Sequence, residues 1–389
     1  MKPYSFSTAQ RIVAGARTLD TIGDTAIALG PGVRRALIVT QPSMLRSGAA
    51  ERAAARLADA GIAADVRIGI EPEPTRDNIE AFHRSIAKEP YDVYIGLGGG
   101  SVLDATKLLA ALRTNEGGIE EMLGTDQVTH AGLPTVLVPT TSGTGSEVTP
   151  NAIVTFPELE LKIGVVSRFL LPNAAILDPE LTIGLPGPVT AATGMDAFTH
   201  ALESYISNKA NPISDMFALE SIRLLSRSLV EAYENGESLA AREDMLIGSM
   251  FGGMALASAG TAAVHALAYP LGGKFGITHG VANSMLLRHV MEFNMDAITD
   301  RLDAVAQAMD VPGASSMSAA RAAEAVVSRI ALWTERLGIP QNLSEFGVAA
   351  EDVPDLAVAA SKVTRLLNNN PKPLALGDME RIYRQLLPR

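Results

Sequence analysis

The first half of the chain alternates short apolar runs with helical patterns, and this alternation restricts the possible folds more than any other feature. The apolar runs lie at 36–40, 64–69, 92–101, 135–141 and 173–178. Helical patterns at 48–60, 76–88 and 102–113 separate the first four runs. Strands spaced by helices of this length form βαβ units and a parallel sheet. We therefore predict an α/β, Rossmann-like domain in this half.

A different organisation begins at 185–188, where the sequence is Leu-Pro-Gly-Pro. Helical periodicity then continues without a convincing strand. The predicted helices span 189–207, 213–235, 238–258, 261–269, 280–292, 299–309, 317–337 and 350–366, and a short helix follows a loop at 368–373. A chain of 389 residues has room for two or three domains of about 150 residues. We predict two, an α/β domain over 1–185 and an all-helical domain over 186–389.

The composition excludes several classes of protein. The formal charge is −11, whereas nucleic acids and anionic membranes attract clusters of Lys and Arg, so we expect neither as a partner. No cysteine is present, which excludes a disulfide scaffold, an iron–sulfur protein, a thiolate zinc site and a cysteine nucleophile. Charged residues are 19% of the chain, below the usual share of about 25%. We therefore expect a covered surface, as in a homodimer or higher homo-oligomer.

One stretch is long enough to cross a bilayer. Residues 245–273 carry no formal charge. The stretch is rich in Gly, Ala, Ser and Thr and contains His265 and Pro270, so we interpret it as buried helices of a protein core. The N-terminal segment has no apolar region of the kind that a signal peptide needs, which predicts a cytoplasmic location.

Two loops have the composition of nucleotide-binding segments. Gly98, Gly99, Gly100 and Ser101 follow a predicted strand and begin a helix, where backbone N–H groups and the helix dipole favour a phosphate. A tight turn would use the same glycines, and Asp104 on that helix fits a capping carboxylate as well as a ligand contact. The second loop, 139–149, has six hydroxyl side chains, including Thr140, Thr141, Ser142, Thr144 and Thr149. Such a surface suits a pyrophosphate, a ribose or a carboxamide.

A carboxylate and three histidines form the most specific pattern. Asp196 and His200 are four residues apart and share one face of a predicted helix. His265 lies in the uncharged stretch, and His279 follows fourteen residues later. One carboxylate and three imidazoles can enclose Fe²⁺, Zn²⁺ or Mn²⁺ and leave a coordination position open. Each histidine alone is more simply a satisfied core residue, but the set predicts a metal site.

Together these motifs resemble the iron-containing, or group III, alcohol dehydrogenases, the family that includes lactaldehyde reductase. The resemblance rests on GGGSVLDATK at 98–107, PTTSGTGSEVT at 139–149, ATGMDAFTHALESY at 192–205 and HALAYPLGGKFGITHGVAN at 265–283. It covers nearly the whole chain. It implies that NAD or NADP binds to the N-terminal domain and that the helical domain holds Fe²⁺, with Zn²⁺ as the alternative.

The resemblance also assigns roles to individual residues. It carries the metal ligands onto Asp196, His200, His265 and His279, which are the residues found from spacing. It places the coenzyme pyrophosphate at Gly98 to Ser101 and the nicotinamide near the hydroxyl loop. Lys162 matches a lysine that contacts the coenzyme, and Asn151 matches a position that lines the substrate pocket.

Three positions depart from the family pattern. Gln41 stands where many NAD-using members have an Asp that repels a 2′-phosphate, so NADP becomes as good an expectation as NAD. Glu73-Pro74-Thr75 replaces the common Asn-Pro-Thr on the adenosine side. Tyr269 replaces a second histidine near the nicotinamide. A phenol with a pKa near 10 can donate a hydrogen bond to a substrate oxygen but is a poor proton shuttle at neutral pH.

The expected activity is reversible hydride transfer between a short-chain primary alcohol or diol and a nicotinamide, with a metal ion polarising the alcohol oxygen. Two enzymes of the same fold group are alternatives: a hydroxyacid–oxoacid transhydrogenase, which keeps its nicotinamide bound, and a zinc glycerol-type dehydrogenase. A non-catalytic scaffold is a further alternative, and the complete ligand set and glycine loop argue against it.

Overall fold

A computed structural model of the chain describes residues 3–159 and 161–388. Its main sheet has six parallel strands in the order β1-β9-β6-β4-β2-β3. The strands are β1 Arg11–Ala14, β2 Arg35–Thr40, β3 Ala63–Ile68, β4 Val93–Gly98, β6 Thr135–Pro139 and β9 Ala174–Leu177. The predicted α/β half is thus confirmed. The sequence pattern missed β1, which has only four residues and no fully buried position.

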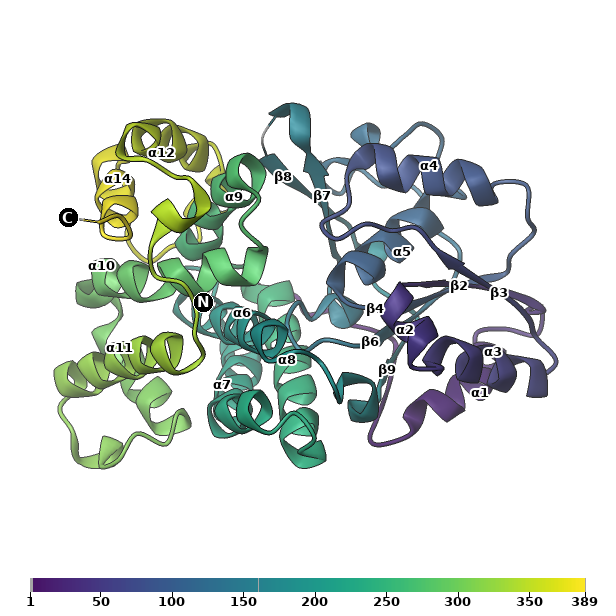
Figure 1. Cartoon of the computed structure of the whole chain (residues 1–389), viewed down its shortest axis with the longest axis horizontal. Helices are drawn as coiled ribbons and strands as arrows, with labels where there is room; N and C mark the ends of the chain where they lie inside the picture. Colours follow the sequence, from purple (N-terminus) through teal and green to yellow (C-terminus); the bar gives the residue numbers. More distant parts are fainter. Residues whose placement is uncertain (1–2, 160, 389) are drawn as a thin grey trace.

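Helices cover both faces of this sheet, whose four central strands, β9, β6, β4 and β2, are buried on both sides. They are α1 Ile22–Ile27, α2 Pro42–Arg46, α3 Ala49–Asp59, α4 Arg76–Ile86 and α5 Gly100–Leu112. Leu37 and Val39 of β2 belong to the hydrophobic cluster of α4 and α5, whereas Ile38 belongs to the cluster of α1 and α3. The alternation follows from the two-residue period of a strand. In Figure 1, α4 and α5 lie above the sheet and α1 and α3 lie below it.

A second sheet of three strands lies beside the first. Its order is β5-β8-β7, with β7 and β8 antiparallel. The strands are β5 Gly124–Thr125, β7 Asn151–Phe156 and β8 Leu161–Val166. The sequence analysis did not predict this sheet. Along β7 buried residues alternate with half-buried ones, so this strand lacks the continuous apolar run that marks the strands of the main sheet.

Helices make up the rest of the described chain, and no described residue after β9 belongs to a strand. They are α6 Gly187–Ile206, α7 Pro212–Glu234, α8 Leu239–Ala259, α9 Ala263–Phe275, α10 His279–Ala308, α11 Ala319–Arg336, α12 Val353–Ser361, α13 Thr364–Leu367 and α14 Leu376–Arg384. The predicted helical half is confirmed, with corrections to individual helices. The segments 280–292 and 299–309 form one helix, α10, and the segment 350–366 is divided between α12 and α13.

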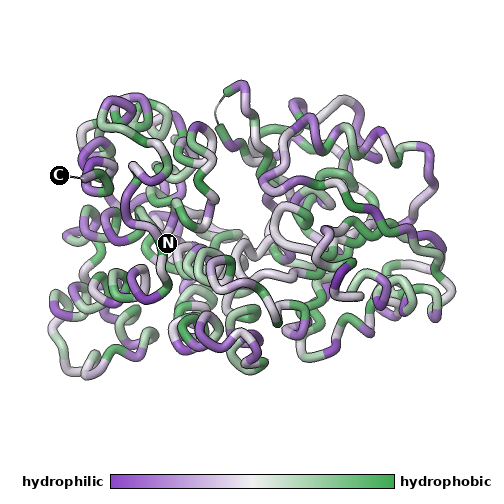
Figure 2. Tube along the Cα trace, in the orientation of Figure 1, coloured by the Kyte–Doolittle hydropathy of each residue, from purple (hydrophilic) through white to green (hydrophobic). Residues whose placement is uncertain are grey.

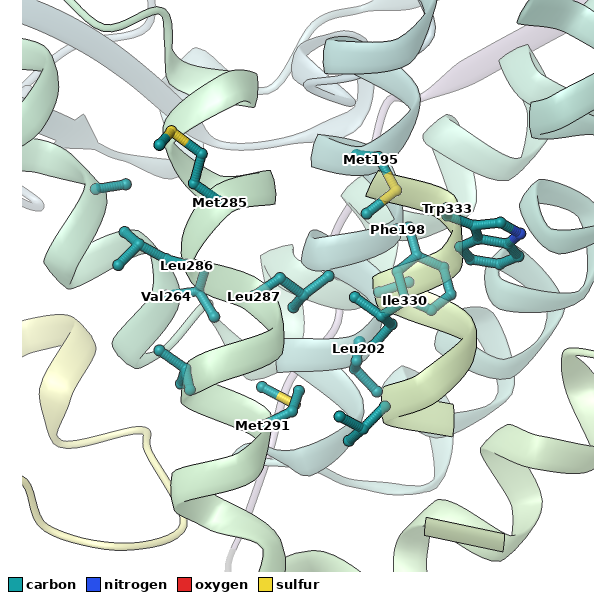
Figure 3. Close-up of a cluster of buried hydrophobic side chains, with 14 of the residues drawn as sticks. Met195, Phe198, Leu202, Val264, Met285, Leu286, Leu287, Met291, Ile330 and Trp333 are labelled. Atoms are coloured by element: carbon teal, nitrogen blue, oxygen red, sulfur yellow. The ribbon is translucent and has the colours of Figure 1, made fainter. Parts of the chain in front are cut away.

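The core of the helical half fixes α6. Met195, Phe198 and Leu202 on this helix point toward Ile330 and Trp333 of α11 (Figure 3). The Phe198 and Trp333 rings meet edge to face, with centroids 5.1 Å apart. Truncating a buried aromatic of this kind to alanine costs about 3–5 kcal/mol. The packing therefore sets the rotation of α6 and with it the direction of the side chains on its other face.

The uncharged stretch forms parts of α8 and α9. No single helix of the described chain is long and apolar enough to cross a membrane, although α8 and α9 pass that test as a pair that is bent by 105°. Met245, Val264 and Leu267 are at most 1% exposed, so the stretch is buried as we interpreted it. Figure 2 shows how hydropathy is distributed along the chain: the outer helices alternate hydrophobic and hydrophilic residues, and the strands of the main sheet are mostly hydrophobic.

Candidate metal centre and coenzyme loops

The four predicted metal ligands converge at one point between three helices. Asp196 and His200 lie one turn apart on α6, His265 lies in the first turn of α9, and His279 is the first residue of α10. One ligand atom from each residue lies within 4.8 Å of all the others. The Nε2 atoms of His200, His265 and His279 are 3.9, 3.8 and 3.7 Å from Asp196 Oδ1. These separations suit four donors around one ion.

The charge states of these residues fit metal binding. Burial alone would raise the pKa of Asp196, but the three histidines and a hydrogen bond from Asn283 outweigh it and lower that pKa. Burial also lowers the pKa of His200, and it lowers the pKa of His279 to about 3. An ionised carboxylate and neutral imidazoles are the forms that bind a metal.

Outer partners orient two of the imidazoles. His200 Nδ1 lies 3.1 Å from the carbonyl oxygen of Gly143, and His265 Nδ1 lies 2.6 Å from Glu203 Oε2. Glu203 is fully buried and accepts backbone N–H bonds from Ala262 and Val264 as well. An acceptor at Nδ1 keeps the proton on that atom and leaves Nε2 as the metal donor. The sequence analysis missed Glu203, although its place three residues after His200 in an apolar helix was a usable signal.

Asn283 is a second residue that sequence reasoning missed. Its Nδ2 atom donates to Asp196 Oδ1 at 2.7 Å and lies 3.1 and 3.2 Å from the Nε2 atoms of His265 and His279. Its Oδ1 atom is buried and has no hydrogen-bond partner within the described chain. An orphaned oxygen beside one carboxylate and three imidazoles is expected in a cation site. The donor set fits Fe²⁺ or Zn²⁺.

The lowered pKa values predict how metal binding responds to pH. Burial lowers the pKa of His200 and lowers that of His279 to about 3, so His279 is neutral at pH 6 and metal binding displaces no proton from it. We therefore expect metal binding at pH 6 to release fewer than two protons. Calorimetric titration of the metal in buffers of different ionisation enthalpy counts the displaced protons. Release of two protons at pH 6 would contradict the prediction.

The two predicted coenzyme loops lie side by side at the carboxyl edge of the main sheet. Gly98 and Pro139 are paired residues at the ends of β4 and β6. Strand β3 lies on one side of β2 and β4 on the other, so the direction of strand addition reverses between β2 and β4. Ligands of open α/β sheets bind at such a reversal. Gln41 directly follows β2, and its Oε1 atom accepts a hydrogen bond of 3.4 Å from Gly99 N.

The start of α5 is suited to an anion. Gly99 occupies the N-cap position and makes no side-chain cap, so the first backbone N–H groups of the helix remain available to a ligand. A Cβ on Gly100 would overlap Thr144, and only glycine allows the two loops to approach this closely. Ser101 follows Gly100 in the first turn of α5 and accepts a hydrogen bond from Glu73 N at 3.0 Å.

The hydroxyl loop contains one conspicuous unpaired group. Thr140 Oγ1 is buried without a partner among the described residues. Thr141, Ser142 and Thr144 follow it in the same loop, and Thr149 is buried at its end. The loop also reaches the helical half, because Gly145, at a φ of 60°, packs directly against Gly253 of α8. It thus lies between the glycine loop and the metal ligands.

Buried charges hold this loop in place. Lys107 donates to the carbonyl oxygens of Ser146, Thr149 and Asn151. Asp104 accepts from Ser146 Oγ and, at 2.9 Å, from Ile153 N. Both Asp104 oxygens are engaged, so its contacts here tie α5 to the loop and to β7. Its predicted coenzyme contact stays a prediction.

The remaining candidates lie on α9 and on the second sheet. Tyr269 on α9 is 7% exposed, its ring centroid is 6.1 Å from that of His279, and burial raises its pKa. Lys162 lies on β8 and Asn151 begins β7. The ammonium of Lys162 is 2.9 Å from Glu73 Oε1, in the loop after β3.

Comparison with known proteins decides the family. The model "Iron-containing alcohol dehydrogenase" matches residues 9–179, and the model of the C-terminal part of the Fe-containing alcohol dehydrogenase family matches residues 190–387. The chain belongs to the iron-containing alcohol dehydrogenase family. It is therefore a metal-dependent oxidoreductase of alcohols and aldehydes that uses iron and a nicotinamide coenzyme.

Relatives support this over the whole chain. Long-chain-alcohol dehydrogenase 1 of Geobacillus thermodenitrificans is 39% identical over 90% of this chain and 89% of its own. The crystal structure of a 1,3-propanediol oxidoreductase superposes with a TM-score of 0.94 at 35% identity, covering 99% of this chain and 100% of its own. That of sulfoacetaldehyde reductase from Bifidobacterium kashiwanohense in complex with NAD⁺ has a TM-score of 0.87 at 29% identity and covers 99% of both chains.

Proposed function

We propose that this alcohol dehydrogenase transfers a hydride reversibly between a short-chain primary alcohol or diol and NAD(P), with Asp196, His200, His265 and His279 holding the metal. The observation that carries the proposal is the convergence of these four side chains, three buried and one half-buried, beside the hydroxyl loop, whose Gly143 carbonyl oxygen contacts His200. When bound there, Fe²⁺, with Zn²⁺ as the alternative, supplies a Lewis acid for the substrate oxygen.

The two halves of the chain divide the work in this proposal. Residues 1–185 hold the coenzyme, and residues 186–389 hold the metal. The ends of the two matched family models, at 179 and 190, support this division. The glycine loop binds the pyrophosphate of the coenzyme, and Thr140 and its neighbours bind its nicotinamide half. The hydroxyl loop places the nicotinamide next to the metal ligands.

In this proposal two side chains contact the substrate. Tyr269 holds its proton because burial raises its pKa, so its hydroxyl can donate a hydrogen bond to the substrate oxygen. Asn151, half-buried at the start of β7, lines the pocket. The likeness to a 1,3-propanediol oxidoreductase supports a small alcohol or diol as substrate.

Isotope transfer tests the reaction itself. Aldehyde reduction with NADH or NADPH that carries deuterium at the transferring C4 position should place the deuterium on the carbinol carbon of the product, because hydride passes directly between the two carbons. Mass spectrometry of the alcohol measures this. Deuterium found in solvent water and absent from the alcohol would contradict the proposal.

Gln41 should set the choice of coenzyme. It lies at the end of β2 beside Gly99 and is uncharged, so it does not repel a 2′-phosphate. Gln41→Asp adds a negative charge and should lower NADPH affinity about 10-fold or more while affecting NADH less. The ratio of kcat/KM values for the two coenzymes measures the shift. An unchanged ratio would remove Gln41 from the coenzyme site.

A homodimer or higher homo-oligomer remains part of the proposal. Strand β1 pairs only with β9 in the described chain, so one edge of the main sheet is unpaired there. The Met216 side chain is 60% exposed. An unpaired edge and exposed apolar side chains favour self-association. Light scattering on the metal-loaded protein measures the mass.

A further inference from the structure

Glu73 stands at a position where the chain departs from the pattern of its family. Hydrogen bonds hold its backbone beside the predicted glycine loop. Its N–H group donates to Ser101 Oγ at 3.0 Å, and its carbonyl oxygen accepts from Thr155 Oγ1 at 3.0 Å. Its φ of 51° lies in the left-handed region, which is uncommon for residues other than glycine. The loop therefore holds Glu73 in one defined place beside the glycine loop.

The side chain of Glu73 extends toward the candidate metal ligands. A single oxygen, Oε1, lies 2.9 Å from Lys162 Nζ and accepts the backbone N–H bond of His279 at 3.1 Å. His279 is the first residue of α10, so the carboxylate also faces the positive end of that helix. One carboxylate thus joins the loop after β3, strand β8 and the helix that carries a metal ligand.

The Lys162 ammonium depends on this carboxylate. The Lys162 side chain is 5% exposed, whereas the Glu73 side chain is 32% exposed. A buried ammonium is costly unless an anion accompanies it. Glu73 is its only ion-pair partner within the described chain. The pair is therefore neutral, and an arriving dinucleotide, which carries a dianionic pyrophosphate, meets no net positive charge from Lys162.

We propose that Glu73 is a positioning residue that holds His279 and Lys162 together and weakens binding of the dinucleotide coenzyme by neutralising Lys162. This inference rests on the proposed coenzyme site at the glycine loop. Two functions of one carboxylate are separable, because the hydrogen bond to His279 needs only an acceptor oxygen, whereas the effect on the coenzyme needs the charge.

Two substitutions separate these functions. Glu73→Gln keeps an oxygen for the His279 N–H group and removes the charge. We expect it to bind NADH and NADPH about 3- to 10-fold more tightly than the wild type, with unchanged metal affinity. The gain should shrink as salt screens the charge. Glu73→Ala removes the acceptor as well and should also lower metal affinity about 10-fold.

The measurements use the full metal-loaded protein. Fluorescence titration gives the dissociation constants of NADH and NADPH at low and high salt, and competition with a chelating dye gives metal affinity. Glu71→Gln is the matched control, because it removes the same charge from an exposed residue two positions away. Thermal unfolding of each variant confirms that it is folded.

Two results would overturn the inference. If the wild type binds coenzyme and Glu73→Gln binds it no more tightly than Glu71→Gln, the inference alone fails. If the metal-loaded wild type binds neither coenzyme, the proposed coenzyme site fails, and the inference fails with it. Tighter binding by Glu73→Gln, combined with metal loss only in Glu73→Ala, is the result we expect.

Discussion

Replacing His265 with alanine should remove both the metal and the activity of this alcohol dehydrogenase. His265 is 2% exposed, and its Nε2 atom is 3.8 Å from Asp196 Oδ1 at the centre of the ligand cluster. Changing an outer partner of a metal ligand typically costs about 10- to 100-fold in metal affinity or activity, and losing the ligand itself should cost more. Metal content after dialysis and kcat/KM with a short aldehyde measure the two losses.

His130→Ala is the control for this substitution. His130 is exposed and lies outside the cluster, so its removal should leave metal content and turnover unchanged. A His265→Ala protein that is free of metal yet fully active would contradict the account, since turnover would then not depend on the site.

Replacing Glu203 with glutamine should weaken metal binding about 10- to 100-fold although Glu203 does not face the ion itself. The carboxylate accepts from Ala262 N, from Val264 N and from His265 Nδ1. A glutamine amide offers one acceptor oxygen where the carboxylate offers two. The His265 ring therefore loses either its charge-assisted partner or its fixed orientation. Competition with a chelating dye measures the affinity.

The exposed residue Glu335 supplies the control, as Glu335→Gln makes the same chemical change on the outside of α11. Unfolding of metal-free protein should show a modest loss of stability for Glu203→Gln, because one buried N–H bond is lost. If metal affinity were equal in the two variants, Glu203 would have no role in orienting His265.

The sequence predicted the metal ligands because three of the four carried a local signal. Asp196 and His200 share a helix face by spacing alone, and His265 stands out in a stretch without charge. Glu203 and Asn283 were harder to find, since a buried polar side chain reveals its role only through its partner. The residue that Glu203 orients is 62 positions away, and the carboxylate that Asn283 contacts is 87 positions away.

The same reason explains why the extent of some helices was predicted wrongly. We predicted separate helices over 280–292 and 299–309, but Asn294 in the region between them is buried within one helix and exchanges two hydrogen bonds with Asn370. The polar side chain of Asn294, which has a low helix propensity, thus finds its hydrogen-bond partner in a distant part of the chain, and the helix continues through it. Similarly, α9 was expected to end before Pro270, whereas it continues to Phe275. Pro270 lies inside this helix although it has no N–H group to donate to the preceding turn, so it does not end the helix as we expected.

The most direct test of the account follows nicotinamide absorbance during turnover. Protein stripped by a chelator is reloaded with Fe²⁺ without air and given a short aldehyde with NADH or NADPH. We predict that coenzyme is oxidised only after reloading, because the Asp196, His200, His265 and His279 cluster must hold the ion. Coenzyme oxidation by protein that is still stripped would contradict the account. If protein that demonstrably holds metal oxidised neither coenzyme, the account would also be contradicted. That result would favour a transhydrogenase with bound nicotinamide.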